Sequence, residues 1–169
     1  ERTSTMEIRE HIISILVNNQ PGVLSRVAGV FSGRGYNIAS LCVAETTNPE
    51  VSRITLTSRA DTDFTEKIKK YLDRLVDVIA VEDFTGTDCV QRELMLIGVT
   101  LPPEHRPEIL RAVELFGCRI VALATEYVIL EVTGDAAFTS SVLKFFSPYG
   151  VEEMNRTGTV AVLQRKDVR

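Results

Sequence analysis

The stretch "QPGVLSRVAGVFSGRGYNIASLCV" at residues 20–43 decides the fold, because the chain repeats its pattern once. The second copy, "RPEILRAVELFGCRIVALAT" at residues 106–125, aligns with it when two small gaps are allowed. Each copy reads as an amphipathic helix, then glycine, then an apolar strand. Recurrence of this kind is typical of a duplicated supersecondary unit. The sequence therefore predicts one folding unit that occurs twice.

The flanking segments complete that unit in the same order on both sides of a polar joint at residues 85–88. In the first half, the pattern predicts strands at 11–17, 37–44, 52–58 and 76–84, and helices at 22–31 and 63–75. In the second half, it predicts strands at 93–100, 119–125, 127–133 and 151–163, and helices at 107–116 and from 135 onward. This order predicts an α+β protein of two ferredoxin-like βαββαβ domains, at residues 7–85 and 90–165.

A domain of this form leaves one sheet face and the sheet edges without cover. In the run from Ile12 to Val17, apolar residues fall on both faces of the expected strand. Unpaired edges and apolar patches are rarely left open in proteins. We therefore expect self-association through the first domain, as a homodimer.

The composition is that of an ordinary globular protein, with 44% hydrophobic residues and a net charge of −4. No cluster of Lys and Arg is present, so we expect neither a nucleic-acid partner nor a membrane surface. No apolar run approaches a membrane span, which predicts a cytoplasmic protein. Residues 1–6 are set aside as a tail. The three cysteines Cys42, Cys89 and Cys118 form no CxxC pair, and we expect them reduced, with Cys42 and Cys118 in strands.

The loop "VNNQPGVL" at residues 17–24 has the chemistry of a small amino-acid pocket. We place Pro21 in the first turn of the following helix, whose unpaired N–H groups and dipole attract a carboxylate. Gly22 lets a ligand approach the main chain closely. The amides of Asn19 and Asn37 can accept an ammonium, and Asn37 leads into a strand expected beside this loop. An aliphatic side chain would then rest on the apolar residues Val23, Leu24 and Ile38.

The same residues also fit a plain structural role. Asn19 can serve as the N-cap of the helix with nothing bound, and Asn37 is a common turn residue after "GRGY". The second half sharpens the choice, because Glu108 stands in place of Gly22 and Arg119 in place of Asn37. A bound ligand is therefore expected to favour the first domain.

Catalytic residues and a metal site are not expected in this chain. The two histidines, His11 and His105, have no paired spacing for zinc, and we interpret them as packed or solvated side chains. No GxGxxG, GKS or GKT motif is present.

With these residues in view, the chain resembles the small, regulatory subunit of acetolactate synthase, also called acetohydroxyacid synthase, which carries an N-terminal ACT domain. The likeness runs from "HIISILVNNQPGVLSRVAGVFSGRGYNIASLCVAETTNPEVSRITL" through "LDRLVDVIAVEDFT" into "RELMLIGV". It implies a non-catalytic chain that binds and activates the catalytic large subunit and makes it sensitive to valine, with leucine or isoleucine as further candidates. Thiamine diphosphate, FAD and Mg would belong to that partner alone, with no cofactor in this chain.

The resemblance also implies where valine binds. In that family, valine lies at the interface between two ACT domains. The matching positions here are Asn19, Gln20, Gly22, Val23, Leu24, Asn37 and Ile38.

Two other classes remain open at this point. One is an ACT-type amino-acid sensor that serves a different enzyme or a transcription regulator. The other is an RNA-binding module, since RNA-recognition domains share this element order. Those domains stack bases on strand aromatics, and "HIISILV" and "SRITLTS" contain none.

Overall fold

The computed structural model describes residues 7–165, so the tail at residues 1–6 lies outside the described part. The chain forms two compact units. The first comprises the N-terminal part through Val90 together with the segment from Thr159, and the second comprises Gln91–Gly158. The chain therefore passes between the units twice. The predicted second domain at residues 90–165 is wrong in this segment, which the structure assigns to the first unit.

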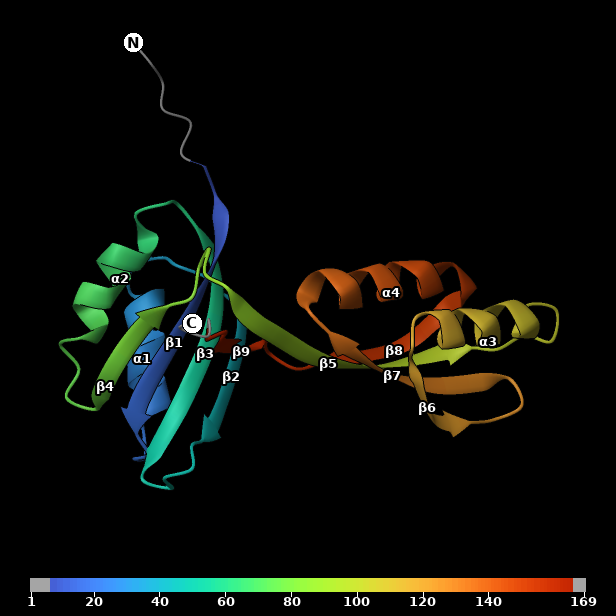
Figure 1. The fold of residues 1–169 in the computed structure, drawn as a ribbon, viewed down its shortest axis with the longest axis horizontal. Helices are drawn as coiled ribbons and strands as arrows, with labels where there is room; N and C mark the ends of the chain where they lie inside the picture. The colour runs from blue at the N-terminus through green and yellow to red at the C-terminus, as the bar shows by residue number, and fades with distance from the viewer. Residues whose placement is uncertain (1–6, 166–169) are drawn as a thin grey trace, which may run out of the picture. The chain divides into compact units, whose positions relative to one another are not determined.

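The first unit has the predicted βαββαβ order. Its elements are β1 (Arg9–Asn18), α1 (Val23–Ser32), β2 (Ile38–Glu45), β3 (Val51–Ala60), α2 (Phe64–Leu72) and β4 (Val78–Asp83). The strands form one antiparallel sheet in the order β2-β3-β1-β4, which leaves β2 and β4 as its edges. Helices α1 and α2 cover one face of this sheet (Figure 1).

The core of this unit lies between the sheet and its two helices. Alternate residues of β1 point into it and meet one stripe from each helix, as the periodicity predicted. These buried residues include Ile13, Ile15 and Val17 from β1, Val23, Val27 and Phe31 from α1, and Phe64, Ile68 and Leu72 from α2. His11 is fully buried with its ring 5.0 Å from that of Phe64. Of the two states predicted for His11, packed or solvated, the structure shows the packed one.

The opposite face of the first sheet is partly covered by the chain itself. Strand β5 (Cys89–Thr100) begins in this unit, and β9 (Val160–Leu163) pairs with it. Ala161 of β9 is buried against Ile12 and Phe84. The predicted strand at 151–163 is therefore wrong as one element, because β8 (Val151–Arg156) ends before Thr157 and β9 returns to the first unit.

The second unit repeats the same order from β5 onward. It contains α3 (Arg106–Leu115), β6 (Arg119–Leu123), β7 (Tyr127–Gly134), α4 (Ala136–Gly150) and β8. Its strands run in the order β6-β7-β5-β8, and α3 and α4 cover one face (Figure 1). The α+β class and the two ferredoxin-like units are thus confirmed. Cys118 lies just before β6 rather than in a strand, whereas Cys42 lies in β2 as predicted.

Candidate functional site

The loop between β1 and α1 is held in place by its own main chain. The N–H of Asn18 donates to the carbonyl of Asp77 at 2.8 Å, and the N–H of Asn19 donates to the carbonyl of Glu50 at 2.7 Å. The first bond ties the end of β1 to the turn before β4, and the second ties it to the hairpin between β2 and β3. Because backbone groups make both bonds, the loop conformation does not depend on a side-chain cap.

Gly22 begins α1 in a conformation that favours glycine. Its φ is 82°, and a Cβ built there would lie 3.0 Å from Nη1 of Arg26. No side chain caps the helix, so the interpretation of Asn19 as N-cap is wrong. Pro21 lies in the turn before the helix and not in its first turn. The predicted role of Gly22, a close approach of a ligand to the main chain, stays a prediction, and the Arg26 guanidinium lies beside the space concerned.

The start of α1 presents unpaired donors to solvent. Within the described residues 7–165, the N–H groups of Gly22, Leu24 and Ser25 donate to no protein acceptor. The aligned peptide dipoles add about half a positive charge at this end of the helix. An anion of carboxylate size can therefore be bound here by backbone groups alone.

Sequence reasoning missed one side chain at this place, Arg26. It lies one turn into α1, and its Nη2 contacts Oδ2 of Asp77 at 2.5 Å while Nη1 faces the Gly22 main chain. The guanidinium thus adds a cation beside the free N–H groups, with one amino group outside the ion pair. The available signal was spacing, because residues i and i+4 of a helix share one face.

The polar loop residues predicted to bind an ammonium have different surroundings. The Asn19 amide donates through Nδ2 to Oε1 of Glu45 at 3.2 Å and to the Pro49 carbonyl at 2.9 Å. Its oxygen is then left as an acceptor. The Gln20 residue is exposed, and its N–H donates to the Asn18 carbonyl.

The two aliphatic residues of the helix start point in opposite directions. Val23 is buried in the core of the first unit, so its side chain is not available to a ligand. Leu24 is 41% exposed and lies next to the free N–H groups. Of these two predicted apolar contacts, only Leu24 is on the surface of the loop.

Asn37 and Ile38 lie at the other end of the sheet. Ile38 and His11 both pair with Ser58 of β3, whereas Glu45 and Val17 both pair with Ser52. The start of β2 is therefore level with the start of β1, roughly 23 Å from the loop that follows the end of β1. The expectation that Asn37 neighbours this loop within one chain is wrong. It failed because β1 and β2 run in the same direction.

Asn37 and Ile38 instead line a shallow depression with residues of α1. The depression is bordered by Ser25, Ala28, Gly29, Ser32, Tyr36, Asn37 and Ile38. The Asn37 carbonyl accepts a hydrogen bond from the Ser58 hydroxyl at 2.7 Å, which fixes the turn into β2. The Asn37 side chain makes no hydrogen bond within the described part of the chain.

Within residues 7–165, no group of three His, Cys, Asp or Glu side chains could hold a metal ion. The described helices include none with both the length and the apolar character needed to cross a membrane. At the equivalent helix start of the second unit, His105 precedes α3 and Glu108 occupies its first turn.

Comparison with known families gives a match on each unit. Residues 13–80 match the model of the AHAS small subunit-like ACT domain, and residues 92–165 match the model of the small subunit of acetolactate synthase. The two matches together span most of the chain. The first of them contains the loop and Gly22.

Individual relatives are similar over nearly their whole length. The probable acetolactate synthase small subunit of Archaeoglobus fulgidus is 42% identical over 155 residues, covering 92% of this chain and 97% of the relative. The acetolactate synthase small subunit of Bacillus subtilis is 37% identical over 153 residues, covering 90% and 89%. The crystal structure of the Thermotoga maritima acetolactate synthase small subunit superposes with a TM-score of 0.86 at 36% identity, covering 94% and 99%.

Length, unit order and sequence agree across these relatives and both family models. The chain belongs to the acetolactate synthase small-subunit family and carries an N-terminal ACT domain.

Proposed function

We propose that this chain is a non-catalytic regulatory subunit that activates the catalytic subunit of acetolactate synthase and makes it sensitive to valine. Thiamine diphosphate, FAD and Mg then belong to the catalytic subunit. The observation that carries the proposal is the start of α1. There, unpaired N–H groups follow a left-handed Gly22 and lie beside the Arg26 guanidinium, in a chain of this family.

The effector's carboxylate is bound by the free N–H groups of Gly22 and Leu24, with Nη1 of Arg26 as a further donor. Charge-assisted hydrogen bonds of this kind are stronger than neutral ones. The valine side chain rests on exposed Leu24 of one copy and on Ile38 of a second copy. These contacts are apolar, which favours valine, leucine or isoleucine over polar amino acids.

The ammonium is bound only when two copies of the chain meet. Strand β2 is an edge strand, and Leu41 and Val43 on it are 37% and 41% exposed. Antiparallel pairing of two β2 edges around a twofold axis sets the start of one strand beside the end of the other. Asn37 and Ile38 of the second copy then approach Glu45 and the Asn19 loop of the first. Asn19 and Asn37 lie far apart within one chain, but Asn19 of one copy and Asn37 of the other then lie close together in the dimer.

A site shared between two copies explains how binding can regulate an enzyme. The effector stabilises one arrangement of the dimer only if it contacts both copies in that arrangement. A coupling free energy of about 1–3 kcal/mol would change the partner's response several-fold to a hundred-fold. The backbone hydrogen bonds of Asn18 and Asn19 hold the loop in place, so the change is carried by the dimer and not by the loop.

The test combines the purified chain with its thiamine-diphosphate-dependent catalytic subunit. Acetolactate formation is measured for the catalytic subunit alone, with the chain added, and with valine titrated into the mixture. We expect activation by the chain and inhibition by valine. Calorimetry of the chain alone with a panel of amino acids separates this function from that of another ACT-type sensor. Indifference to every branched-chain amino acid, or an effector of a different class, would overturn the valine assignment.

A further inference from the structure

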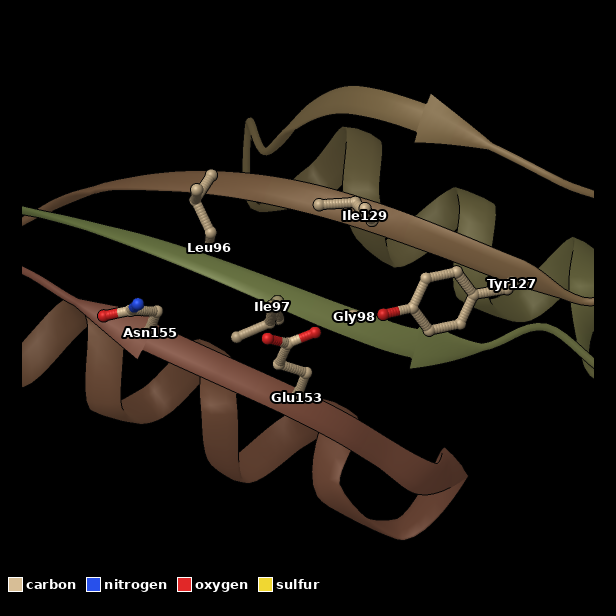
Figure 2. A pocket seen from close by; sticks show the side chains of 7 residues that line it. All are labelled: Leu96, Ile97, Gly98, Tyr127, Ile129, Glu153 and Asn155. Atoms are coloured by element: carbon tan, nitrogen blue, oxygen red, sulfur yellow. The ribbon is translucent and has the colours of Figure 1, made fainter.

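The second unit contains a hollow on the sheet face that its helices leave open. Strands β7, β5 and β8 run side by side here, with Gly98 paired to Ile129 on one side and to Glu153 on the other. The hollow has a volume of about 190 Å³ and is lined by Leu96, Ile97, Gly98, Tyr127, Ile129, Glu153 and Asn155 (Figure 2). It belongs entirely to the second unit and shares no residue with the loop before α1.

The absence of a side chain at Gly98 lets Tyr127 lie across β5 at the border of this hollow. A Cβ built on Gly98 would lie 1.7 Å from the Tyr127 hydroxyl oxygen, so the hydroxyl occupies the space that any other residue would fill. Figure 2 shows the Tyr127 ring reaching from β7 toward Gly98, while Glu153 extends from β8 toward the same part of β5. The aromatic ring, the aliphatic side chains and the carboxylate therefore border one space.

The side chains around Tyr127 are acidic, and no counterion for them lies among the lining residues that the structure describes. Glu153 makes no ion pair within the described residues, and no Lys or Arg lines the hollow. A second, more open depression adjoins it on the other side of Tyr127, and Glu126 and Glu152 line it, again without a Lys or Arg. Arg106 donates to the Thr125 carbonyl nearby and lines neither space.

We propose that this hollow binds a basic side chain, Lys or Arg, from the catalytic subunit. The inference rests on the proposed function, since it names a contact between the two subunits. An aliphatic stem fits against Leu96 and Ile129, and the charged head meets the Glu153 carboxylate and the face of Tyr127. The Asn155 amide oxygen and the Tyr127 hydroxyl supply further acceptors.

The charge argues against other occupants of the hollow. An anion or a zwitterion's carboxylate would face Glu153 without a cationic partner. A second copy of this chain, stacked face to face, would set the same carboxylates against each other. A partner with the opposite charge both neutralises the site and covers the exposed apolar surface of Leu96.

The experiment compares two variants of Glu153 with matched variants of Glu114, an exposed acidic residue on α3, on the other face of the same sheet. Glu153→Gln removes the charge, and Glu153→Lys reverses it, while Glu114→Gln and Glu114→Lys make the same changes elsewhere. Affinity for the purified catalytic subunit is measured at low and at high salt. We expect Glu153→Gln to weaken binding about tenfold and Glu153→Lys more, with a smaller salt dependence in both. The Glu114 variants should bind like wild type.

The outcomes separate this inference from the proposed function. Failure of the wild-type chain to bind the catalytic subunit overturns both. Normal binding by wild type and by Glu153→Lys alike overturns the inference and leaves the proposed function standing. A change in the chain's own oligomeric mass, with affinity for the catalytic subunit unchanged, assigns the face to a second copy and also overturns it. Thermal unfolding verifies that each variant is folded. The variant Tyr127→Phe tests the same hollow independently, and we expect it to lower affinity for the catalytic subunit less than Glu153→Gln does.

Discussion

Arg26 and Asp77 form an ion pair, with 2.5 Å between Nη2 and Oδ2, that joins the first turn of α1 to the turn before β4. Asp77 also accepts the N–H of Asn18 through its carbonyl oxygen, so both ends of the loop meet at this residue. The pair is accessible to solvent, since the two side chains are 49% and 22% exposed. The ion pair therefore contributes little to the stability of the fold, and its main effect is to position the Arg26 guanidinium.

Replacing Arg26 by Ala should weaken valine binding without unfolding the protein. An exposed ion pair contributes about 0–1 kcal/mol, so thermal stability should change little. Loss of a charged donor to the carboxylate should lower valine affinity about tenfold. Calorimetry measures the affinity, and Arg26→Lys is the control that keeps the charge. An unchanged valine affinity in Arg26→Ala would exclude the guanidinium from the site.

Replacing Asp77 by Asn should have the opposite effect on the same measurement. The substitution removes the carboxylate that competes for Arg26 and keeps the backbone carbonyl that binds Asn18. Valine should then bind as tightly as in wild type or more tightly. A loss of affinity equal to that of Arg26→Ala would mean that the ion pair itself, and not the free guanidinium, shapes the site.

Replacing Gly22 by Asp should abolish the response to valine while the catalytic subunit is still activated. The new carboxylate would lie where the effector's carboxylate binds, and Asp tolerates the left-handed backbone better than most L residues. Gly86→Asp is a matched control in the first unit, because Gly86 has φ of 68° and nothing within 4 Å of a built Cβ. Valine titration of enzyme activity compares the two, and inhibition that survives in Gly22→Asp contradicts the proposed pocket.

Much of the fold could be predicted because local patterns determine it. The apolar stripe of α1 and the alternation in β3 each indicate one element and the face that meets the core. The return of β9 to the first unit could not be predicted in this way. Its residues read as the continuation of β8, and only the packing of Ala161 on Ile12 and Phe84 shows where the segment lies.

The candidate site was only partly predictable for a related reason. Gly22 could be predicted, because a glycine directly before a predicted helix is visible in the local sequence alone. The distance between Asn19 and Asn37 depends on strand direction and register. Local sequence patterns do not determine either of these. Arg26 was missed because its position beside Gly22 depends on the start of the helix lying at Val23.

Alkylation of Cys118 should be slower in the folded protein than in the unfolded chain. Burial raises the pKa of the Cys118 thiol, so at a given pH a smaller fraction is thiolate, the reactive form. The raised pKa also means that this group contributes stability below its unfolded pKa, and this contribution is lost as the pH rises through its folded pKa. Mass spectrometry of iodoacetamide labelling between about pH 7.5 and 10 measures the rate, with the chain in urea as control. Equal rates in the two states at every pH would contradict the prediction.

Removing Arg156 should destabilise the second unit more than neutralising Glu93. Arg156 donates through Nε to Oε1 of Glu93 at 3.0 Å, and Thr139 donates to the same oxygen. The Glu93 side chain is only 5% exposed, whereas that of Arg156 is 30% exposed. Arg156→Ala therefore leaves a buried carboxylate with a single hydroxyl partner, while Glu93→Gln leaves a guanidinium that water can reach.

We expect a loss of about 3 kcal/mol for Arg156→Ala, because an uncompensated buried charge is costly. Glu93→Gln should cost about 1 kcal/mol, because its amide oxygen still accepts hydrogen bonds. The double variant Glu93→Leu with Arg156→Leu should cost less than Arg156→Ala, since it leaves no charge without a partner. A chain of two units need not unfold in one step, so hydrogen exchange of peptides from β5 and β8 is the suitable measurement. An equal loss of protection in Arg156→Ala and Glu93→Gln would mean that Glu93 reaches solvent once Arg156 is gone, and that the pair only fills space between β5 and α4.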